Sequence, residues 1–292
     1  MSLMIFLTGY SIPQTDPPRS PREALPTMYD LPSEFPEEPG LPDEFHDLQP
    51  QLLSRTLHLK DCAADNRFTG SDLNLYYDGQ HPLWHKRPDW FLALDVPRLY
   101  DGREPRRSYV VWQERYSPTV IIEFLSPRTE REDLGRFYES ADQVEDGRLN
   151  NGPNGSPDTL LEAASGDDGV DKIAPPSKVV AYEKYLRVPH YLVYSRYTQR
   201  LRYFKLIGSR YEEQPVQAQA PMIWLSDLEI GLGLWDGYFE GLPGPWLRWC
   251  DAAGNWCLTD TEQERLAKEQ TQERADRLAE KLRSLGVDPD QV

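Results

Sequence analysis

Glu123 is the residue whose surroundings most strongly indicate chemistry. It lies in the run TVIIEFL, where the positions facing either side of an extended chain are apolar, so the run predicts a strand buried on both faces. A carboxylate in such a strand costs several kcal/mol unless it is paired, hydrogen-bonded or bound to a cation. Three interpretations remain open: a metal or catalytic site, a structural ion pair with an arginine, or an exposed strand end.

Asp89 is the second acidic candidate. It follows Pro88 and opens the apolar run WFLAL, so it lies at a predicted strand entrance where a carboxylate can face a cleft; an ordinary turn aspartate is the alternative. Two carboxylates on neighbouring central strands suit a hard divalent cation, because magnesium takes oxygen ligands and keeps several waters. Asp89 and Glu123 together therefore predict a magnesium or manganese site.

Strand and helix patterns surround these two residues. Short β-branched and aromatic runs predict a sheet from DLNLYYD, PDWFLALDV, SYVVWQE and TVIIEFL, and a hairpin from YLVYS and LRYFKLI. Helical spacing of apolar residues predicts a helix over 43–59 and another in KVVAYEKYLRV, which ends before Pro189. TEREDLGRFY predicts a short helix or turn. The predicted class is therefore α/β (α+β).

Composition divides the chain into four predicted regions. Residues 1–42 are rich in Pro and acidic residues and predict an extended arm, whereas 43–245 predict the core. A Gly, Asn, Ser, Asp and Pro stretch at 140–177 predicts an insertion loop within that core. Residues 246–258 place Trp side chains around an Ala-Gly-Asn turn and predict a β-hairpin appendage, and 259–292 predict a long charged helix.

The C-terminal helix carries apolar residues three and four positions apart, as in a short coiled-coil seam. These residues are Ala275, Leu278, Leu282 and Leu285. Nearer its start, the corresponding positions hold Lys268 and Thr271. The pattern leaves two interpretations, a homodimer zipper and a solvated helix.

Charge and apolar content limit the functional classes. With 39% hydrophobic residues, no apolar run near the roughly 18 residues of a membrane span and no signal-peptide pattern at the start, the sequence predicts a soluble, cytoplasmic protein. Three cysteines without CxxC spacing predict reduced thiols. The net charge of −16 opposes nucleic-acid binding unless positive charge is concentrated locally. Residues 178–210 hold eight Lys or Arg side chains against one acidic residue, so a local basic face is expected.

Several motifs occur in the order found in a known family. They are the PD of RPDW, a strand ending in E-x-x-SP before TEREDLG, a helix ending in LRVPHYLVYSR, and the block GLGLWDG…WLRW…GNW. On these motifs, about residues 30–290 resemble the Uma-two type restriction endonucleases. The resemblance implies a PD-(D/E)XK nuclease fold, a mixed central sheet flanked by helices, and magnesium-dependent hydrolysis of nucleic-acid phosphodiesters.

The resemblance also implies roles for individual residues. Asp89 and Glu123 match the acidic pair of the superfamily, whereas Leu125 stands where its motif has lysine. Lys178, at the start of the next helix, is the matching position. It would place a positive charge beside the attacking water or the scissile phosphate; a solvated helix residue is the alternative.

Other polar residues are weaker candidates. Asp72 is a potential third oxygen ligand from an adjacent strand, and Glu44 and His46 lie near the first helix, from which some nucleases of this superfamily lend a carboxylate. Several arginines could follow phosphates; they are Arg106, Arg107, Arg128, Arg131 and Arg136.

Two further functional hypotheses compete with a nuclease. The acidic flanks, the missing lysine at Leu125 and the coiled-coil-like tail favour a catalytically degenerate nuclease fold that acts as a binding or scaffold module through its C-terminal helix. Alternatively, the acidic segments could mimic nucleic acid and occupy the basic face, which would make the protein autoinhibited.

Overall fold

The computed structural model describes residues 43–126, 129–138, 174–217, 219, 221–285 and 288–289. The predicted arm at 1–42 lies outside these residues, and so do residues 140–173 of the predicted insertion loop.

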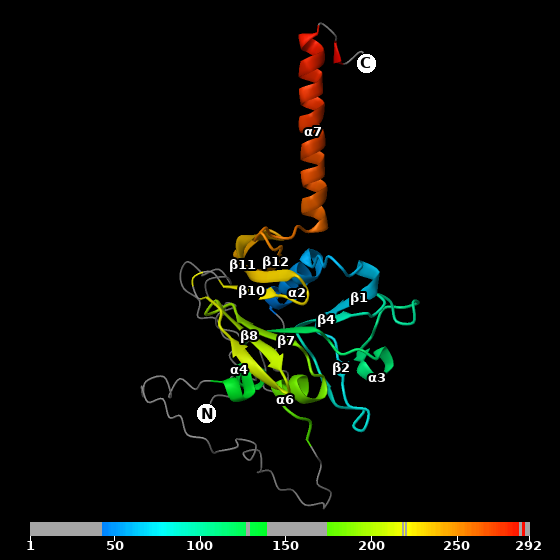
Figure 1. Ribbon diagram of the computed structural model, residues 1–292, viewed down its shortest axis with the longest axis vertical. Helices are drawn as coiled ribbons and strands as arrows, with labels where there is room; N and C mark the ends of the chain where they lie inside the picture. The colour runs from blue at the N-terminus through cyan, green and yellow to red at the C-terminus, as the bar shows by residue number, and fades with distance from the viewer. Residues whose placement is uncertain are drawn as a thin grey trace, which may run out of the picture. The chain divides into compact units, whose positions relative to one another are not determined.

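A mixed six-stranded sheet forms the centre of the fold, in the order β1-β4-β6-β7-β8-β9 (Figure 1). Its strands are β1 (Arg67–Gly70), β4 (Trp90–Leu94), β6 (Val120–Phe124), β7 (His190–Ser195), β8 (Arg200–Ile207) and β9 (Arg210–Gln214). Strands β6 and β7 run parallel, whereas all other neighbours in this sheet are antiparallel. The mixed sheet expected from the sequence is thereby confirmed.

One face of the central sheet packs against a helix and a second sheet. The helix is α2 (Glu44–Thr56), and the second sheet has three antiparallel strands, β10 (Met222–Leu225), β11 (Ile230–Phe239) and β12 (Leu242–Cys250). Alternate residues of the central strands, among them Trp90, Ile122 and Phe124, join this core. The helix predicted over 43–59 is confirmed as α2.

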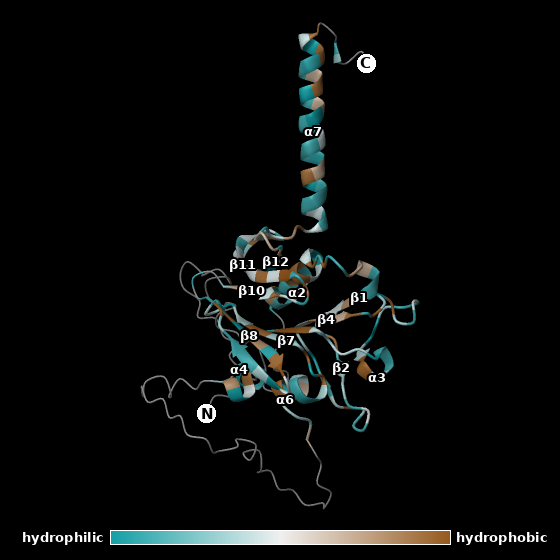
Figure 2. Cartoon of the chain, viewed as in Figure 1, coloured by the Kyte–Doolittle hydropathy of each residue, from teal (hydrophilic) through white to brown (hydrophobic). Residues whose placement is uncertain are grey.

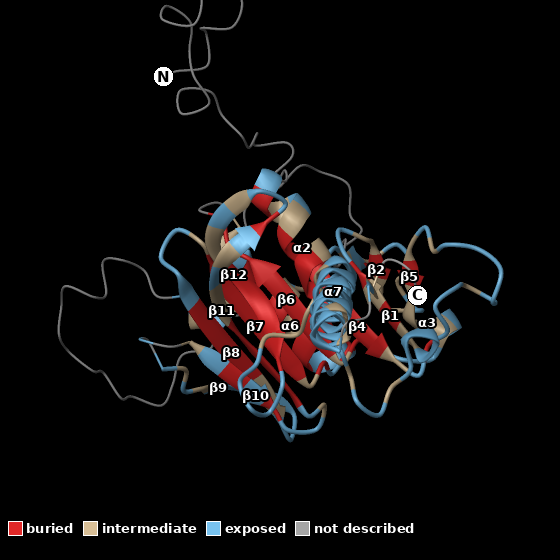
Figure 3. Cartoon of the chain, turned by 90° about the horizontal axis from the view of Figure 1, so that it is seen from above, coloured by how far each residue is buried: buried red, intermediate tan, exposed pale blue. Residues whose placement is uncertain are grey.

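The opposite face is covered by short helices. These are α4 (Glu130–Leu134), the 3₁₀ turn η2 (Gly135–Phe137), α6 (Lys178–Val180) and the π-helical turn η3 (Ala181–Tyr185). They contribute Leu134, Val179 and Tyr182 to a core that includes Phe91 and Ile121 of the sheet. Both faces of β4, β6 and β7 are therefore buried, as the red strands of Figure 3 show.

A third, small sheet joins the side of the short helices and differs from the prediction. It contains β2 (Leu75–Tyr76), β3 (His85–Lys86) and β5 (Tyr109–Val110) in the order β3-β2-β5. The run SYVVWQE forms only this short strand, because the chain then turns into α3 (Val111–Glu114), which ends at Arg115 with a φ of 69°. A 3₁₀ turn, η1 (Ala64–Asn66), precedes β1, a strand that the sequence patterns did not predict.

The C-terminal part differs from the predicted appendage. Strand β12 pairs with β11 along its length, from Gly231↔Cys250 to Phe239↔Leu242, and only one bridge, Cys250↔Trp256, closes the turn that follows. Trp246 and Trp249 are buried in the core beside α2. Burial of two large indole rings stabilises this region as part of the core.

A long helix, α7 (Asp260–Ser284), follows and confirms the sequence prediction. Thr259 and Glu262 form a capping box at its start, where the Thr259 side chain accepts from the Glu262 N–H and the Glu262 side chain accepts from the Thr259 N–H. None of its residues is buried, and Figure 2 shows a mainly hydrophilic surface. Among the helices of the described residues, none has the length and apolar character needed to cross a membrane.

The Gln49 side chain joins α2 to β12, and this link yields a testable prediction. Its amide nitrogen donates to the Leu247 carbonyl and its amide oxygen accepts from the Leu247 N–H, both at 2.8 Å, with Gln49 fully buried. Gln49→Ala leaves both buried backbone groups unpaired, so we expect the free energy of unfolding in urea to fall by about 2 kcal/mol or more. Gln51→Ala, on the same helix, is the control, because Gln51 bonds only within α2. Equal losses in the two variants would contradict the prediction.

Candidate functional site

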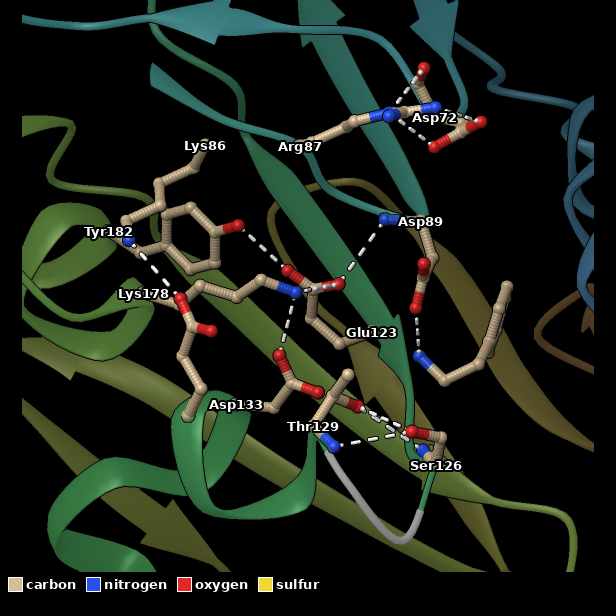
Figure 4. Close-up of polar contacts among 12 residues, drawn as sticks. Asp72, Lys86, Arg87, Asp89, Glu123, Ser126, Thr129, Asp133, Lys178 and Tyr182 are labelled. Carbon is tan, nitrogen blue, oxygen red and sulfur yellow. Dashed lines mark hydrogen bonds and ion pairs between the residues drawn. The ribbon is translucent and has the colours of Figure 1, made fainter. Parts of the chain in front are cut away.

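The Glu123 carboxylate lies at the end of β6, on the face covered by α4 and α6 (Figure 4). It is completely buried, as the apolar pattern of its strand predicted. Its neighbours in the sheet place it between Val193 of β7 and the entrance of β4. Glu123 therefore needs polar partners from its own surroundings, because water does not reach it.

Asp89 supplies one of these partners through its backbone. The Asp89 N–H donates to Glu123 Oε2 at 3.2 Å, and Asp89 Oδ2 in turn accepts from the Phe124 N–H at 2.6 Å. The Glu123 side chain thus binds the Asp89 backbone, and the Asp89 side chain binds the backbone of Phe124, the residue after Glu123, where β4 begins and β6 ends. The structure brings together the predicted pair, with one oxygen of Asp89 already engaged.

Lys178 is the first residue of α6, and its ammonium reaches the same point. Nζ lies 3.2 Å from Glu123 Oε2 and 2.7 Å from Asp133 Oδ1, with only 14% of the side chain exposed. Leu125, the position that the family resemblance assigned to lysine, is buried in the apolar core on this face. Lys178 of α6 therefore supplies a positive charge beside Glu123, whereas Leu125 does not.

Two members of the cluster were not singled out by the sequence analysis. Tyr182 donates its hydroxyl hydrogen to Glu123 Oε1 at 2.7 Å, from the turn after Lys178. Asp133 is buried in α4 and forms an ion pair with Lys178, but neither of its oxygens has a well-formed hydrogen bond to another residue that the structure describes. The i, i+4 spacing of Lys178 and Tyr182 was a usable signal, because such residues share a helix face.

Burial and charge shift the titration of the cluster in consistent directions. Burial raises the pKa of Glu123 well above its ordinary value and also raises the pKa of Asp133, although the Lys178 ammonium opposes both shifts. Burial alone would lower the pKa of Lys178, but Asp133, Glu123 and Asp89 outweigh it and raise that pKa well above the usual value. Lys178 therefore stays protonated at neutral pH.

The donor set is chemically suited to a hard cation. Three carboxylates, those of Asp89, Glu123 and Asp133, surround a single ammonium, and the buried Asp133 oxygens lack well-formed hydrogen bonds. As arranged, however, the described residues contain no group of three acidic, His or Cys side chains that meets the geometry of a metal centre. Lys178 Nζ lies where the carboxylates of Glu123 and Asp133 converge.

The weaker candidates do not join the cluster by any direct contact among the described residues. Asp72 forms an exposed ion pair with Arg87, 2.6 Å between Oδ1 and Nε. Glu44 is exposed at the start of α2, and His46 Nε2 contacts the Phe124 carbonyl at 3.2 Å. Because α2 packs on the other face of the sheet, Glu44 and His46 approach the strand end from the side opposite Glu123.

The predicted phosphate-binding arginines have mixed surroundings. Arg106 binds Glu114 with two hydrogen bonds and is almost fully buried, and Arg136 pairs with Glu183 at 2.5 Å. Arg107 and Arg131 are exposed. The fifth, Arg128, lies outside the described residues.

Comparison with known proteins leaves the family resemblance as a prediction. No family model matches the chain. No curated protein shows significant similarity to it.

The raised pKa of Glu123 predicts how stability depends on pH. Because folding raises this pKa, the native state holds the proton more tightly than the unfolded chain does. This difference stabilises the fold below the ordinary pKa value of 4.5, and the stabilisation is lost as the pH rises through the raised pKa. Glu123→Gln removes this titration. We expect its free energy of unfolding, relative to the unchanged protein, to rise with pH above about 4.5, by at most about 1.4 kcal/mol per pH unit.

Urea unfolding at a series of pH values from about 4.5 upward measures this difference, because the window opens at the ordinary glutamate value. Glu212→Gln, at an exposed position of β9, is the matched control and is expected to follow the unchanged protein in parallel. A difference for Glu123→Gln that stays constant with pH would contradict the assigned shift.

Proposed function

We propose that this protein is a metal-dependent endonuclease that hydrolyses nucleic-acid phosphodiester bonds. The observation that carries the proposal is the convergence of Glu123 and Asp133 on Lys178 Nζ, with Asp89 bound to Glu123 beside them. The motifs that resemble the Uma-two type endonucleases support the same activity, because Asp89, Glu123 and Lys178 are the residues they point to.

The charge balance of the cluster supports a cation. One ammonium faces three carboxyl groups in a largely buried place, and a bound cation would favour the ionised form of Glu123, which burial disfavours. Asp89 and Glu123, with Asp133 beside them, are the residues that would hold Mg²⁺ or Mn²⁺. Such an ion supplies activation of water and neutralisation of phosphate charge when bound.

Lys178 has a defined role in this proposal. Its raised pKa excludes it as a general base at neutral pH, because it keeps its proton. As a fixed positive charge it stabilises negative charge that develops on a phosphate. Tyr182 positions the Glu123 carboxylate through the bond to Oε1.

Calorimetric titration with magnesium or manganese tests the cation site. We expect the unchanged protein to bind the ion and Glu123→Gln to bind it about tenfold or more weakly, because a ligand oxygen is lost. The exposed Glu212→Gln is the matched control and is expected to bind as the unchanged protein does. Equal affinity of the unchanged protein and Glu123→Gln for the ion would contradict the proposed cation site.

Lys178→Met separates transition-state stabilisation from metal binding. We expect cleavage of a DNA or RNA substrate to fall about 10²- to 10³-fold. Metal affinity is expected to be retained or to increase, because a competing positive charge is removed. Lys184→Met is the control, because Lys184 is exposed on the helical segment that follows Lys178. Unchanged cleavage in Lys178→Met would refute the assigned role.

A second candidate function is a degenerate nuclease fold that acts as a binding module. Both Glu123 oxygens already accept hydrogen bonds, from Tyr182 and from the Asp89 N–H, so the cluster satisfies much of its own polarity. In addition, α7 extends over 25 residues with none buried. Sedimentation of the full chain and of a Leu278→Glu, Leu282→Glu variant tests self-association through α7. If the full chain is a dimer and the substitutions dissociate it, self-association through α7 is supported. If the full chain is a monomer, this self-association is contradicted.

A further inference from the structure

The hairpin β2–β3 is rich in rings for its length. Residues 75–86 contain two tyrosines, a tryptophan and two histidines, with Leu83 near the tip. Tyr76 and His85 lie opposite each other across the hairpin, their ring centroids 5.1 Å apart. This composition is unusual for a solvent-facing turn, where polar residues and glycine are more common.

The tip of the hairpin is braced by its own contacts. Asp78 accepts from the Gln80 N–H at 2.9 Å and contacts His81 Nδ1 at 2.7 Å. The His81 ring stacks on Trp84 with centroids 3.9 Å apart and planes 10° apart, and the Trp84 N–H donates to the His81 carbonyl at 2.8 Å. The rings are therefore held in place before any partner binds, which lowers the entropic cost of binding.

Apolar and aromatic surface at this braced tip faces solvent. Leu83 is 83% exposed, and the His81 side chain, which covers Trp84, is 37% exposed. A rigid loop with an exposed leucine beside a stacked ring pair offers both a wedge and a flat surface to a partner.

The base of the hairpin is attached to the two helices that carry the site. Lys86 Nζ lies 3.2 Å from Glu132, the neighbour of Asp133 in α4. Tyr77 packs edge-on against Tyr185 of η3, with ring centroids 5.5 Å apart, in the turn that also carries Tyr182. Its hydroxyl is buried and has no hydrogen-bond partner within the described part of the chain. The hairpin therefore has a fixed relation to Lys178 and Asp133.

We propose that this hairpin binds unpaired nucleic-acid bases, with Leu83 and the His81–Trp84 stack as the contact surface. On this inference, which rests on the proposed nuclease function and refines it, the substrate is single-stranded or locally unpaired beside the scissile bond. Aromatic side chains stack on any base, because every base presents a flat π-face.

Charge at the base of the hairpin is balanced. Lys86 pairs with Glu132 and Arg87 pairs with Asp72, and the single carboxylate within residues 75–86, that of Asp78, is bound by His81. In a protein whose net charge is −16, this balanced region repels a polyanion less than the acidic remainder of the chain does.

The test measures binding of the full chain to two probes in EDTA, where cleavage is suppressed. One probe is a fluorescein-labelled single strand of oligothymidine of about 16 nucleotides, and the other is a blunt DNA duplex of equal length. By fluorescence anisotropy we expect tighter binding of the single strand. Leu83→Ser and His81→Ala are each expected to weaken that binding about tenfold and to leave duplex binding unchanged.

Leu83→Ser keeps the test decisive, because so exposed a residue contributes little to folding. Tyr238→Ser, at an exposed position of β11, is the matched control and is expected to bind both probes as the unchanged chain does. Equal affinity of the unchanged chain for both probes, binding by Leu83→Ser equal to that of Tyr238→Ser, or no binding at all would each overturn the inference.

The same proteins distinguish this inference from the nuclease proposal. If the protein cleaves nucleic acid with manganese but the hairpin variants bind the single strand normally, the nuclease proposal is supported and the role of the hairpin is contradicted. If the hairpin variants bind the single strand more weakly but no manganese-dependent cleavage occurs, the base-binding role of the hairpin is supported and the nuclease proposal is contradicted.

Discussion

The interaction on which the site depends is the pairing of the buried Glu123 carboxyl group with polar partners. Water does not reach this carboxylate, so the protein supplies the Asp89 N–H, the Tyr182 hydroxyl and the Lys178 ammonium in its place. Each comes from a different part of the chain: Asp89 directly precedes β4, Tyr182 lies in η3 and Lys178 begins α6. Removing one partner of a buried ion pair costs roughly 3–5 kcal/mol, because the other charge is left uncompensated. The positions of the three elements are therefore energetically tied to one carboxylate.

The parallel pairing of β6 and β7 explains why these groups meet. Parallel neighbours require a crossover connection, and here the crossover begins with α4 and ends with α6 and η3. Both described ends pack on one face of the sheet, the face to which Glu123 points. Asp133 therefore arrives from before the crossover and Lys178 from after it. The 44 residues at 134–177 separate them in sequence, yet their charged atoms lie 2.7 Å apart.

Sequence patterns predicted the elements that are regular and missed those that depend on packing. The runs of β4, β6, β7 and β8 were recognised because they are rich in β-branched and aromatic residues, and α7 because its composition favours a helix. Strand β11 carries glycines; at Gly231 a side chain would meet Cys250 Sγ at 2.5 Å, so close packing, not strand propensity, determines that position. Asp133 lies in the charged run EREDL, which looks solvated, and only tertiary packing buries it. Glu123 was identifiable from burial alone, whereas Lys178 needed the family resemblance.

The link between Gln49 and Leu247 has a consequence for assembly. Strand β12 is the last strand of its sheet, and an uncovered edge of this kind can recruit a strand from another molecule. The Gln49 amide occupies the donor and the acceptor that a foreign strand would use at Leu247. At the far edge of the central sheet, β9 instead presents Arg210, Glu212 and Glu213. Detachment of α2 would therefore uncover a β-edge beside buried tryptophans, a surface that favours association with another chain.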